Sequence, residues 1–222
     1  MGLHVIDLRF AHARHAAADG PALDSVDVRF PSRQISLITG ANGAGKTTFL
    51  HLLACLLRPD RGEIRAEGEP VSRWSGPHRD RWRRRVGIVF QHFRLIDDLT
   101  VLENVMLPGI PMNSDIRMLR RAGMDALERL GIVDLASRRT FELSGGERQK
   151  AAVARAVAST PRYLIADEPF SHQDFDGRER MVGILRSLAA GGATVVVASH
   201  EEVMDWADRA FRLDSGRLES IR

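Results

Sequence analysis

The chain has 222 residues, a formal net charge of +3 at pH 7 and a sequence pI near 9.7, with 44% hydrophobic and 27% charged residues. This composition is that of an ordinary globular protein, and the length suffices for one sizeable α/β domain. Aromatic residues make up only 6% of the chain and are scattered along it, whereas nucleic-acid binding requires a cationic stripe with stacking platforms. No nucleic-acid partner is therefore expected.

Cys55 is the only cysteine, so no disulfide framework is possible within the chain and a reducing compartment is expected. We expect it to be a core residue. The first ten residues, MGLHVIDLRF, have neither a basic leader followed by a long apolar segment nor a small-residue cleavage site. No apolar run approaches the roughly 18–20 residues needed to span a bilayer. We therefore expect no direct membrane insertion, and membrane association only through a partner.

Three segments near the N-terminus have strand character, since they alternate or run apolar at strand length. They are LHVIDLRF (3–10), VDVRF (26–30) and ISLIT (35–39). We predict a small β region that leads into a glycine-rich loop.

That loop reads GANGAGKTT (40–48). Its spacing, Gly40-x-x-x-x-Gly45-Lys46-Thr47, fits a phosphate loop, in which small residues let backbone N–H groups turn inward around an anion. The residues that follow keep an apolar face at helical spacing, so the loop opens a helix whose N-terminal end also favours the anion. Lys46 would reach the β- and γ-phosphates of a nucleotide, and the Thr47 hydroxyl would hold Mg²⁺. Glycine-rich turns are common, but few match this pattern with both neighbours correct.

Three short apolar runs with β-branched residues predict central parallel strands covered on both faces. They are VGIVF (86–90), YLIA (163–166) and TVVVAS (194–199). Between the first two lie about seventy residues rich in Leu, Met and Arg, with helical spacing. We predict one domain, in which residues 1–90 and 160–222 form an α/β core and residues from about 91 to 159 form an inserted helical subdomain.

Two carboxylates, Asp167 and Glu168, end the predicted strand in YLIADEP. An acidic residue there can reach Mg²⁺ held by Thr47, directly or through water, while an adjacent Glu can polarise an attacking water. The alternative is that the pair merely caps the next helix. After a phosphate loop at this distance, the pair predicts an ATPase.

The segment LSGGERQK (143–150) opens another helix. Ser144, Gly145 and Gly146 offer a hydroxyl and backbone N–H donors at the helix start, which is again an anion site. One nucleotide cannot easily use both loops of one chain. A head-to-tail pair of chains could place each serine-glycine loop over its neighbour's γ-phosphate.

The order of these motifs resembles that of the ABC-type ATPases, and further family motifs occur in order across almost the whole chain. Gln91 in VFQHF matches the glutamine that senses Mg²⁺ and the γ-phosphate and moves with the helical subdomain. His200 in VVVASHE matches the histidine expected at the γ-phosphate. Phe10 falls where the family usually has an aromatic residue stacked on adenine, and Asp174 in SHQD fits the aspartate of the loop that connects the two sites of a dimer.

Other interpretations of these residues exist. Taken alone, His200 would more often be a histidine capping a helix, and Gln91 alone would carry no information. Phe10 could be a plain core residue. The chain also departs from the family at His172 and Gln173, where relatives usually carry a small residue or Asn followed by Leu.

The resemblance implies an α/β fold with a P-loop NTPase core, an N-terminal antiparallel β region and an inserted α-helical subdomain. It implies ATP and Mg²⁺ as cofactors and a homodimer held together through ATP. The implied catalytic residues are Lys46, Gln91, Glu168 and His200. The implied nucleotide-binding residues are Phe10, Gly40, Asn42, Gly43, Ala44, Gly45, Lys46, Thr47, Thr48, Ser144, Gly145, Gly146 and Asp174. The implied metal ligands are Thr47, Gln91 and Asp167.

The strongest block of charge is HRDRWRRR (78–85). We predict a solvated helix in which nearby acidic side chains offset the positive charge of the arginines. The alternatives are proximity to anionic lipid head groups, when the protein is docked under a membrane partner, and RNA binding.

The resemblance further implies an ATP-hydrolysing subunit that energises an integral-membrane, permease-type partner from the cytoplasmic face of the inner (plasma) membrane. The run FRLIDDLTVLENVMLP (93–108) resembles the branch of lipoprotein-releasing, macrolide-export and cell-division ABC ATPases, whereas DEPFS resembles some importers. The alternatives are a soluble ABC ATPase acting on DNA or ribosomes, a regulator of periplasmic cell-wall hydrolysis in cell division, and a nucleotide switch without turnover.

Overall fold

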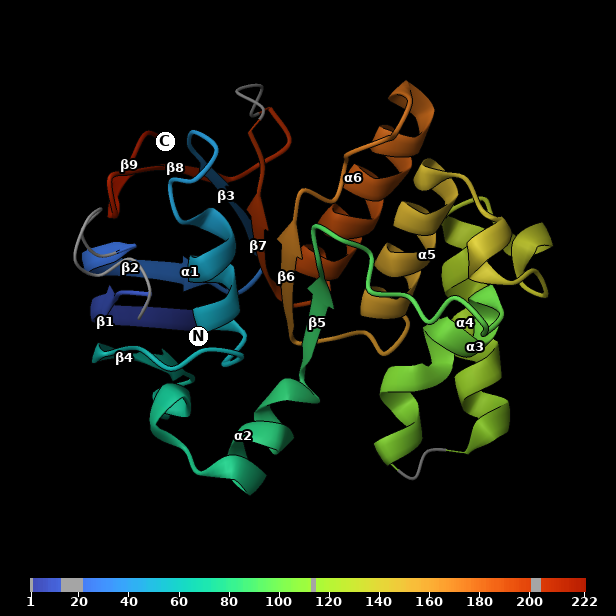
Figure 1. Ribbon diagram of the computed structural model, residues 1–222, viewed down its shortest axis with the longest axis horizontal. Coiled ribbons are helices and arrows are strands. Elements are labelled where there is room, and N and C mark those ends of the chain that lie inside the picture. The colour runs from blue at the N-terminus through green and yellow to red at the C-terminus, as the bar shows by residue number, and fades with distance from the viewer. Residues whose placement is uncertain (1, 13–21, 113–114, 201–204) are drawn as a thin grey trace.

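The computed structural model describes residues 2–12, 22–112, 115–200 and 205–222 (Figure 1). The strands are β1 (Gly2–Phe10), β2 (Leu23–Pro31), β3 (Gln34–Thr39), β4 (Arg61–Ala66), β5 (Val86–Val89), β6 (Tyr163–Asp167), β7 (Thr194–Ala198), β8 (Arg209–Asp214) and β9 (Arg217–Ser220). The α-helices are α1 (Lys46–Leu53), α2 (Gly76–Arg83), α3 (Val101–Met106), α4 (Ile116–Arg129), α5 (Gly145–Val157) and α6 (Phe175–Ala190). Short 3-10 helices are η1 (Val71–Arg73), η2 (Leu107–Met112), η3 (Val133–Leu135) and η4 (Thr140–Glu142).

The described strands form two sheets. A three-stranded antiparallel sheet has the order β2-β1-β4, and a six-stranded sheet has the order β5-β6-β7-β3-β8-β9. In the larger sheet the strands from β5 to β8 run parallel, and β9 pairs antiparallel with β8. The predicted fold class, an α/β core with an antiparallel N-terminal region, is therefore confirmed.

The three N-terminal segments do not all belong to the same sheet. The segment ISLIT forms β3 in the middle of the larger sheet, between β7 and β8. The third strand of the small sheet is β4, whose sequence RGEIRA carries too many charges to have been recognised as a strand. The small sheet therefore forms from segments on both sides of the phosphate loop.

Each face of the larger sheet packs into its own hydrophobic core, as expected for a parallel sheet covered on both sides. On β7, Val195 and Val197 pack against the core formed with α3 to α6. The alternate residues, Val196 and Ala198, pack into the core formed with α1 and the small sheet. The phosphate loop and the helical region thus lie on opposite faces of one sheet.

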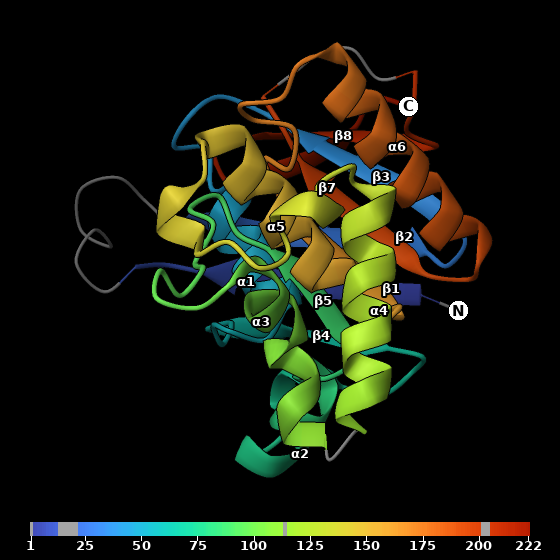
Figure 2. The same ribbon diagram turned by 90° about the vertical axis from the view of Figure 1, so that its right-hand side faces the viewer.

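The stretch between β5 and β6 contains α3, α4 and α5, which contact one another (Figure 2). Helix α3 begins with a capping box, in which Thr100 and Glu103 exchange side-chain and backbone hydrogen bonds. Helix α4 turns its small residues inward, and a methyl group added at Gly123 would lie 2.8 Å from Leu102 Cδ1. Glycine at this position therefore lets the two helices approach closely.

The basic block forms α2 and the turn that leads into β5. Trp82 is the residue of α2 that is buried, whereas most of the arginines remain at least partly exposed. Arg83 pairs with Asp80 at 3.1 Å and also donates to the carbonyl oxygen of Cys55 at 3.0 Å. The prediction of a solvated helix is confirmed, but among the described residues Arg83 is the one arginine of the block that an acid is shown to pair.

Candidate functional site

The glycine-rich loop joins the end of β3 to the start of α1, and two of its glycines cannot be replaced without a clash. Gly45 is the N-cap of α1 at φ 101°, and a methyl group there would lie 2.7 Å from the Ala22 carbonyl oxygen. At Gly40, with φ 149°, the added methyl would lie 2.3 Å from the Leu213 carbonyl oxygen. Only glycine fits both positions, so the spacing predicted from the sequence has a steric cause. The loop therefore ends at a helix start, where anions are favoured.

Lys46 lies against the loop with only 8% of its surface exposed. Its Nζ donates hydrogen bonds to the carbonyl oxygens of Gly40 at 2.7 Å and Ala41 at 3.2 Å. The ammonium is thus held at the loop, where phosphate oxygens could replace these carbonyl acceptors. A cavity of about 570 Å³ adjoins the same loop, lined by Thr39, Gly40, Ala41, Asn42, His200 and Arg212 among others.

Thr47 and Asp167 form a pair of hard oxygen ligands. The Thr47 hydroxyl donates to Asp167 Oδ2 at 2.6 Å, and Asp167 is buried at the end of β6. Burial raises the pKa of Asp167 above its ordinary value, while the Thr47 bond and the nearby charges of His51 and Lys46 oppose this shift. Hydroxyl and carboxylate oxygens fit Mg²⁺, which usually takes one or two protein ligands together with phosphate and water.

Among the residues that the structure describes, no group of three or more His, Cys, Asp or Glu side chains is arranged to hold a metal. The Thr47 and Asp167 oxygens would therefore hold Mg²⁺ only together with phosphate and water.

Glu168 and His200 form a second pair, at the ends of β6 and β7. The strands are in register, with Asp167 opposite Ala198, and the Glu168 N–H donates to the Ala198 carbonyl oxygen at 2.9 Å. This pairing brings Glu168 Oε2 to 3.0 Å from His200 Nδ1. The carboxylate is buried more deeply than the imidazole, so an exposed ring holds a partly buried carboxylate in place.

Gln91 follows β5, the neighbour of β6. The register pairs Val86 with Tyr163 and Val89 with Ala166, so β5 and β6 end at the same edge of the sheet and Gln91 follows β5 there. Gln91 itself is exposed. Its position at the same strand-end edge fits a residue that senses the reacting phosphate.

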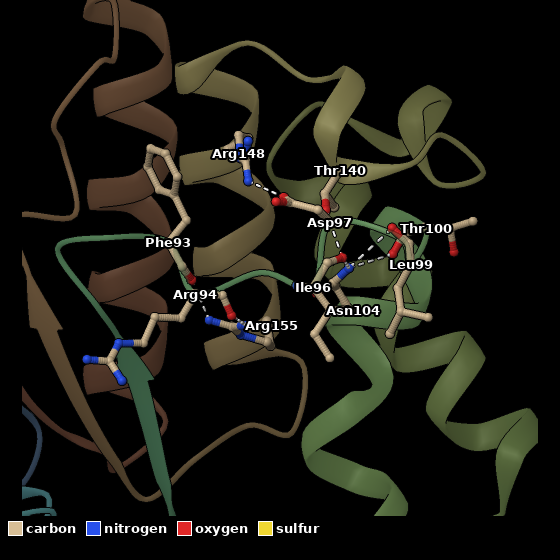
Figure 3. A network of polar contacts seen from close by, with 10 residues as sticks. All are labelled: Phe93, Arg94, Ile96, Asp97, Leu99, Thr100, Asn104, Thr140, Arg148 and Arg155. Carbon is tan, nitrogen blue, oxygen red and sulfur yellow. Dashed lines mark hydrogen bonds and ion pairs between the residues drawn. The ribbon is translucent and has the colours of Figure 1, made fainter.

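The segment that follows this glutamine is fixed to α5 by two arginines (Figure 3). Arg155 donates to the carbonyl oxygens of Phe93 at 2.7 Å and Arg94 at 2.5 Å, and Arg148 forms an ion pair with Asp97. Because both arginines belong to α5, any displacement of that helix would pull on the segment.

Asn104 of α3 fixes the same segment further along (Figure 3). Its side chain accepts from Ile96 N at 2.7 Å and donates to the carbonyl oxygens of Ile96 and Thr100, both at 3.0 Å. The Thr140 hydroxyl also donates to the Ile96 carbonyl oxygen at 3.0 Å. None of these contacts was predicted from the sequence, since each depends on how the helices pack.

The start of α5 is ordered by a capping box between Ser144 and Glu147. The Ser144 Oγ donates to Glu147 Oε2 at 2.7 Å, and the Ser144 N–H donates to the same carboxylate at 2.8 Å. These bonds lower the pKa of Glu147 below its ordinary value. In Figure 1, this helix start and the loop before α1 both lie at the upper end of the molecule, with β6 and β7 between them.

Phe10, predicted to stack on adenine, is instead a core residue. Its ring is 9% exposed and belongs to the core beneath the small sheet. The exposed ring at this end of β1 is His12, which meets the Phe10 ring edge-on at a centroid distance of 5.0 Å. His12 Nε2 is also in hydrogen-bond contact with Thr48 Oγ1 at 3.1 Å. The ring beside the phosphate loop is therefore His12, which the sequence interpretation missed.

Asp174 caps α6, accepting a hydrogen bond from Gly177 N at 2.8 Å. The preceding Gln173 donates from Nε2 to the carbonyl oxygen of Gly146 at 2.9 Å. The segment after Glu168 therefore contacts the serine-glycine loop of the same chain.

A phosphate loop, a buried threonine–aspartate pair and a glutamate–histidine pair at adjacent strand ends together define a phosphate-loop ATPase. The sequence profile described as "ABC transporter" matches residues 23–171. The chain belongs to the ABC transporter family of ATP-binding cassettes and is an ABC ATPase. In the described part of the chain, no helix has the length and apolar character needed to cross a membrane.

Individual relatives agree with this assignment. The chain is 35% identical over 208 residues to the lipoprotein-releasing system ATP-binding protein LolD 2 of Rhodopirellula baltica, covering 90% of this chain and 82% of that protein. It is 38% identical over 202 residues to an uncharacterized ABC transporter ATP-binding protein of Thermotoga maritima, covering 90% and 86%.

A solved structure also has the same fold. The dimeric structure of MJ0796, a bacterial ABC transporter cassette, matches with a TM-score of 0.90 at 28% identity, covering 99% of both chains. A second structure of MJ0796, in a post-hydrolysis state bound to ADP and Pi, matches equally well.

Proposed function

We propose that this chain binds ATP with Mg²⁺, pairs head-to-tail with a second copy, and uses ATP hydrolysis to energise an integral-membrane partner. The observation that carries the proposal is the pairing at two adjacent strand ends. Thr47 with Asp167 at 2.6 Å and Glu168 with His200 at 3.0 Å lie at the edge of the sheet that also carries the phosphate loop. One pair suits a metal ion and the other suits an attacking water.

The residues around the phosphates have separate roles in this proposal. Lys46 exchanges its loop carbonyl acceptors for β- and γ-phosphate oxygens. Thr47 and Asp167 hold Mg²⁺, which neutralises developing charge on the phosphates when bound. Gln91, exposed just beyond the end of β5, senses the γ-phosphate. Gly40 and Gly45 keep the backbone close to the anion because no side chain fits there.

Glu168 orients and activates water for attack on the γ-phosphate. Its carboxylate is partly buried, and His200 Nδ1 contacts it at 3.0 Å and holds it in place. His200 is more exposed, and its other ring nitrogen, Nε2, can face the γ-phosphate. Hydrolysis then weakens the contacts between the two chains.

The dimer follows from the separation of the two anion sites within one chain. The start of α5 and the phosphate loop lie on opposite sides of β6 and β7 (Figure 1), so a second chain would be needed to bring a serine-glycine loop over the γ-phosphate. The dimeric MJ0796 cassette, which shares this fold, supports the same arrangement.

His12 replaces Phe10 as the residue proposed to stack on adenine. It is exposed, it contacts Thr48 of the phosphate loop, and the Phe10 ring supports it edge-on. An imidazole offers a flat surface to a base, as other aromatic rings do.

A groove between α2 and the helical region suits the membrane partner. Two adjoining cavities of about 350 and 260 Å³ share Pro108, Arg155 and Ser159 in their walls. Nearby exposed side chains include Ile110, Ile116 and Met118, the last of which lines the larger cavity. We propose that residues from about 91 to 159 move as one helical subdomain and carry the partner with them, with the chain peripheral on the cytoplasmic face of the membrane.

The similarity to LolD 2 supports placing the chain in the branch of lipoprotein-releasing, macrolide-export and cell-division ATPases. In that branch the partner would transmit force across the membrane rather than conduct a solute.

The first experiment compares wild type with Glu168→Gln. We expect ATP to shift the variant from monomer to dimer in size-exclusion chromatography, while its turnover falls about a hundredfold or more. Glu179→Gln, the same change at an exposed position of α6, is the control and should retain turnover. Equal turnover in the Glu168 variant would refute the role of this residue.

The partner is tested by tagging the Glu168→Gln chain in its native cell and purifying it from mild detergent with ATP and Mg²⁺. A stoichiometric integral-membrane protein, identified by mass spectrometry, is expected. Recovery of ribosomal or DNA-repair proteins without a membrane subunit would overturn the transporter-type proposal.

A further inference from the structure

Helix α2 packs on the core through the face that carries Trp82. This side chain is buried and meets the ring of Tyr163 at a centroid distance of 4.6 Å. Its neighbour Arg83 donates to the carbonyl oxygen of Cys55 at 3.0 Å and pairs with Asp80 at 3.1 Å. The positive charge of Arg83 is therefore used within the fold.

The opposite face of α2 carries three exposed arginines at helical spacing, Arg81, Arg84 and Arg85. The helical geometry continues through these positions, since Arg84 is the C-cap and the Arg85 N–H donates to the Trp82 carbonyl oxygen at 2.8 Å. Residues three and four apart lie on one side of a helix, so the three guanidinium groups share a face. In the part of the chain that the structure describes, none of the three forms an ion pair with a carboxylate.

The start of α4 repeats this pattern with a second set of exposed arginines, Arg117, Arg120 and Arg121. Their spacing again places them on one side of the helix. The nearby acid, Asp115, caps the helix by accepting a hydrogen bond from the Arg117 N–H at 2.8 Å. Exposed apolar side chains, those of Ile116 and Met118, lie next to these arginines in the chain.

Both sets of arginines belong to elements at the same end of the molecule. Figures 1 and 2 both show α2 and the start of α4 at the lower end, whereas the phosphate loop lies at the upper end in Figure 1. A cavity of about 260 Å³ lies between the two elements, and its walls include Arg84 and Pro108, the latter in the segment that leads to α4. We call the two sets of three arginines the basic end.

The basic end is electrostatically unfavourable in the free chain. Like charges three and four residues apart destabilise a helix. The C-terminal end of α2 attracts cations and offsets part of this repulsion, but the start of α4 is the positive end of its helix dipole, where cations are unfavourable. A face that only meets water would be more stable with acidic residues among the arginines. The arrangement therefore indicates a partner that supplies negative charge.

We propose that the basic end binds the anionic head groups of a lipid bilayer directly. A bilayer surface presents many negative charges over a wide area, which matches arginines spread over two helices. The exposed side chains of Ile110, Ile116 and Met118 lie in the same region and suit the boundary between head groups and acyl chains.

RNA matches the basic end less well, because α2 offers no free ring on which a base could stack. Trp82 is buried, and Trp74 is half-buried and lies against His78 at a ring-centroid distance of 6.2 Å. The inference goes beyond the proposed function, because this contact needs neither ATP nor a membrane subunit.

The test is co-sedimentation of the purified full-length chain with vesicles at low salt, without nucleotide. One set of vesicles contains phosphatidylcholine alone, and the other contains phosphatidylcholine and phosphatidylglycerol in equal parts. The test variant combines Arg81→Gln, Arg84→Gln and Arg85→Gln. The matched control combines Arg129→Gln, Arg186→Gln and Arg217→Gln, which are exposed positions at the end of α4, on α6 and on β9. Both variants lower the formal net charge from +3 to zero, so only the position of the charges differs.

We expect the wild-type chain to bind the vesicles with phosphatidylglycerol and not those without it. Each arginine near an anionic surface contributes about fivefold in affinity, so the α2 variant should bind about a hundredfold more weakly. The control should lose less than about threefold, because salt screens charges more than about 10 Å from the surface. A second variant, with Arg117, Arg120 and Arg121 changed to Gln, should also bind more weakly. Unchanged ATP turnover and thermal unfolding in solution show that each variant folds.

Three results would overturn the proposal. The first is an equal loss of binding in the α2 variant and the control, which would show that only the net charge matters. The second is equal binding to both kinds of vesicle. The third is tighter binding of polyuridylate RNA than of vesicles, lost in the α2 variant, which would assign the basic end to RNA. If the role of Glu168 in turnover failed instead, vesicle binding would be unaffected, so the two proposals fail separately.

Discussion

Replacing Asn104 by alanine should lower the stability of the folded chain by removing a buried network that the sequence does not reveal. The side chain is 0% exposed and bonds to both the N–H and the carbonyl oxygen of Ile96. After the replacement, the Ile96 carbonyl oxygen keeps the Thr140 hydroxyl, and the Thr100 carbonyl oxygen keeps the backbone N–H of residue 104. The Ile96 N–H is the group that loses its partner.

One partly buried donor without a partner costs about 2 kcal/mol of unfolding free energy. For a chain of this size, that corresponds to a fall in Tm of about 4–8 °C. Thr140→Val alone should cost about 1 kcal/mol or less, because Asn104 still donates to the Ile96 carbonyl oxygen. Thr140→Ser, which keeps the hydroxyl, is the matched control.

The double variant provides the sharper test. With both side chains changed, the Ile96 carbonyl oxygen loses both donors, so the combined loss should exceed the sum of the single losses by about 1 kcal/mol. Urea unfolding followed by circular dichroism measures all four corners of this cycle. If the two single losses add up to the loss of the double variant within about 0.5 kcal/mol, Asn104 and Thr140 do not act through the shared Ile96 carbonyl oxygen.

Three further predictions concern the nucleotide site and its surroundings. His12→Ala should weaken ATP binding about tenfold in a titration with a fluorescent nucleotide, because one stacking contact is lost. Phe10→Ala should mainly lower the Tm. The reverse pattern would restore the stacking role to Phe10. Burial raises the pKa of Cys55 to about 12, so a thiol reagent at pH 8 should label the folded chain far more slowly than the urea-unfolded chain; rapid labelling of the folded chain would contradict this. Because this pKa is raised on folding, the associated stability is complete below about pH 8.5 and is lost as the pH rises toward 12. Thr47→Val removes the hydrogen bond that lowers the pKa of Asp167, so this pKa should rise further. Mg²⁺-dependent turnover should fall at least about a hundredfold, while nucleotide binding without Mg²⁺ is retained. Undiminished turnover would exclude the Thr47 oxygen as a metal ligand.

The sequence predicted those parts of the site whose structure depends on neighbouring residues in the chain. Gly40 and Gly45 have positive φ angles that only glycine adopts easily, so their spacing alone indicates the loop. Asp167 and Glu168 follow an apolar strand, and parallel strands end at a common edge, so their place near Thr47 could be expected.

The error at Phe10 comes from an irregularity in β1. Leu3 and Val5 are buried, but beyond Asp7, at φ 45°, the buried positions shift to Leu8 and Phe10. The register with β2 shifts there as well, as in a β-bulge. A bulge changes which face each later residue occupies, and the sequence gives no clear sign of it.

The contacts of Gln173 and of Asn104 could not be predicted for a different reason. They join segments that lie far apart in the chain, so the sequence does not indicate that they meet. Examples are the contacts of Gln173 with Gly146 and of Thr140 with Ile96. The strand β8, RAFRLD, was also missed because its charged residues conceal a strand in which Ala210, Phe211 and Leu213 are buried.

The backbone of Glu168, the residue that we propose activates water, is held in a strained conformation. This residue holds φ at 48°, a conformation that costs a non-glycine residue about 1 kcal/mol or more. Bonds to Ala198, Gln149 and Ser171 hold it there from three directions. Glycine or asparagine would relax this strain, so selection for stability alone would favour a protein without its carboxylate. Laboratory evolution toward heat resistance should therefore tend to silence this ATPase unless turnover is selected at the same time.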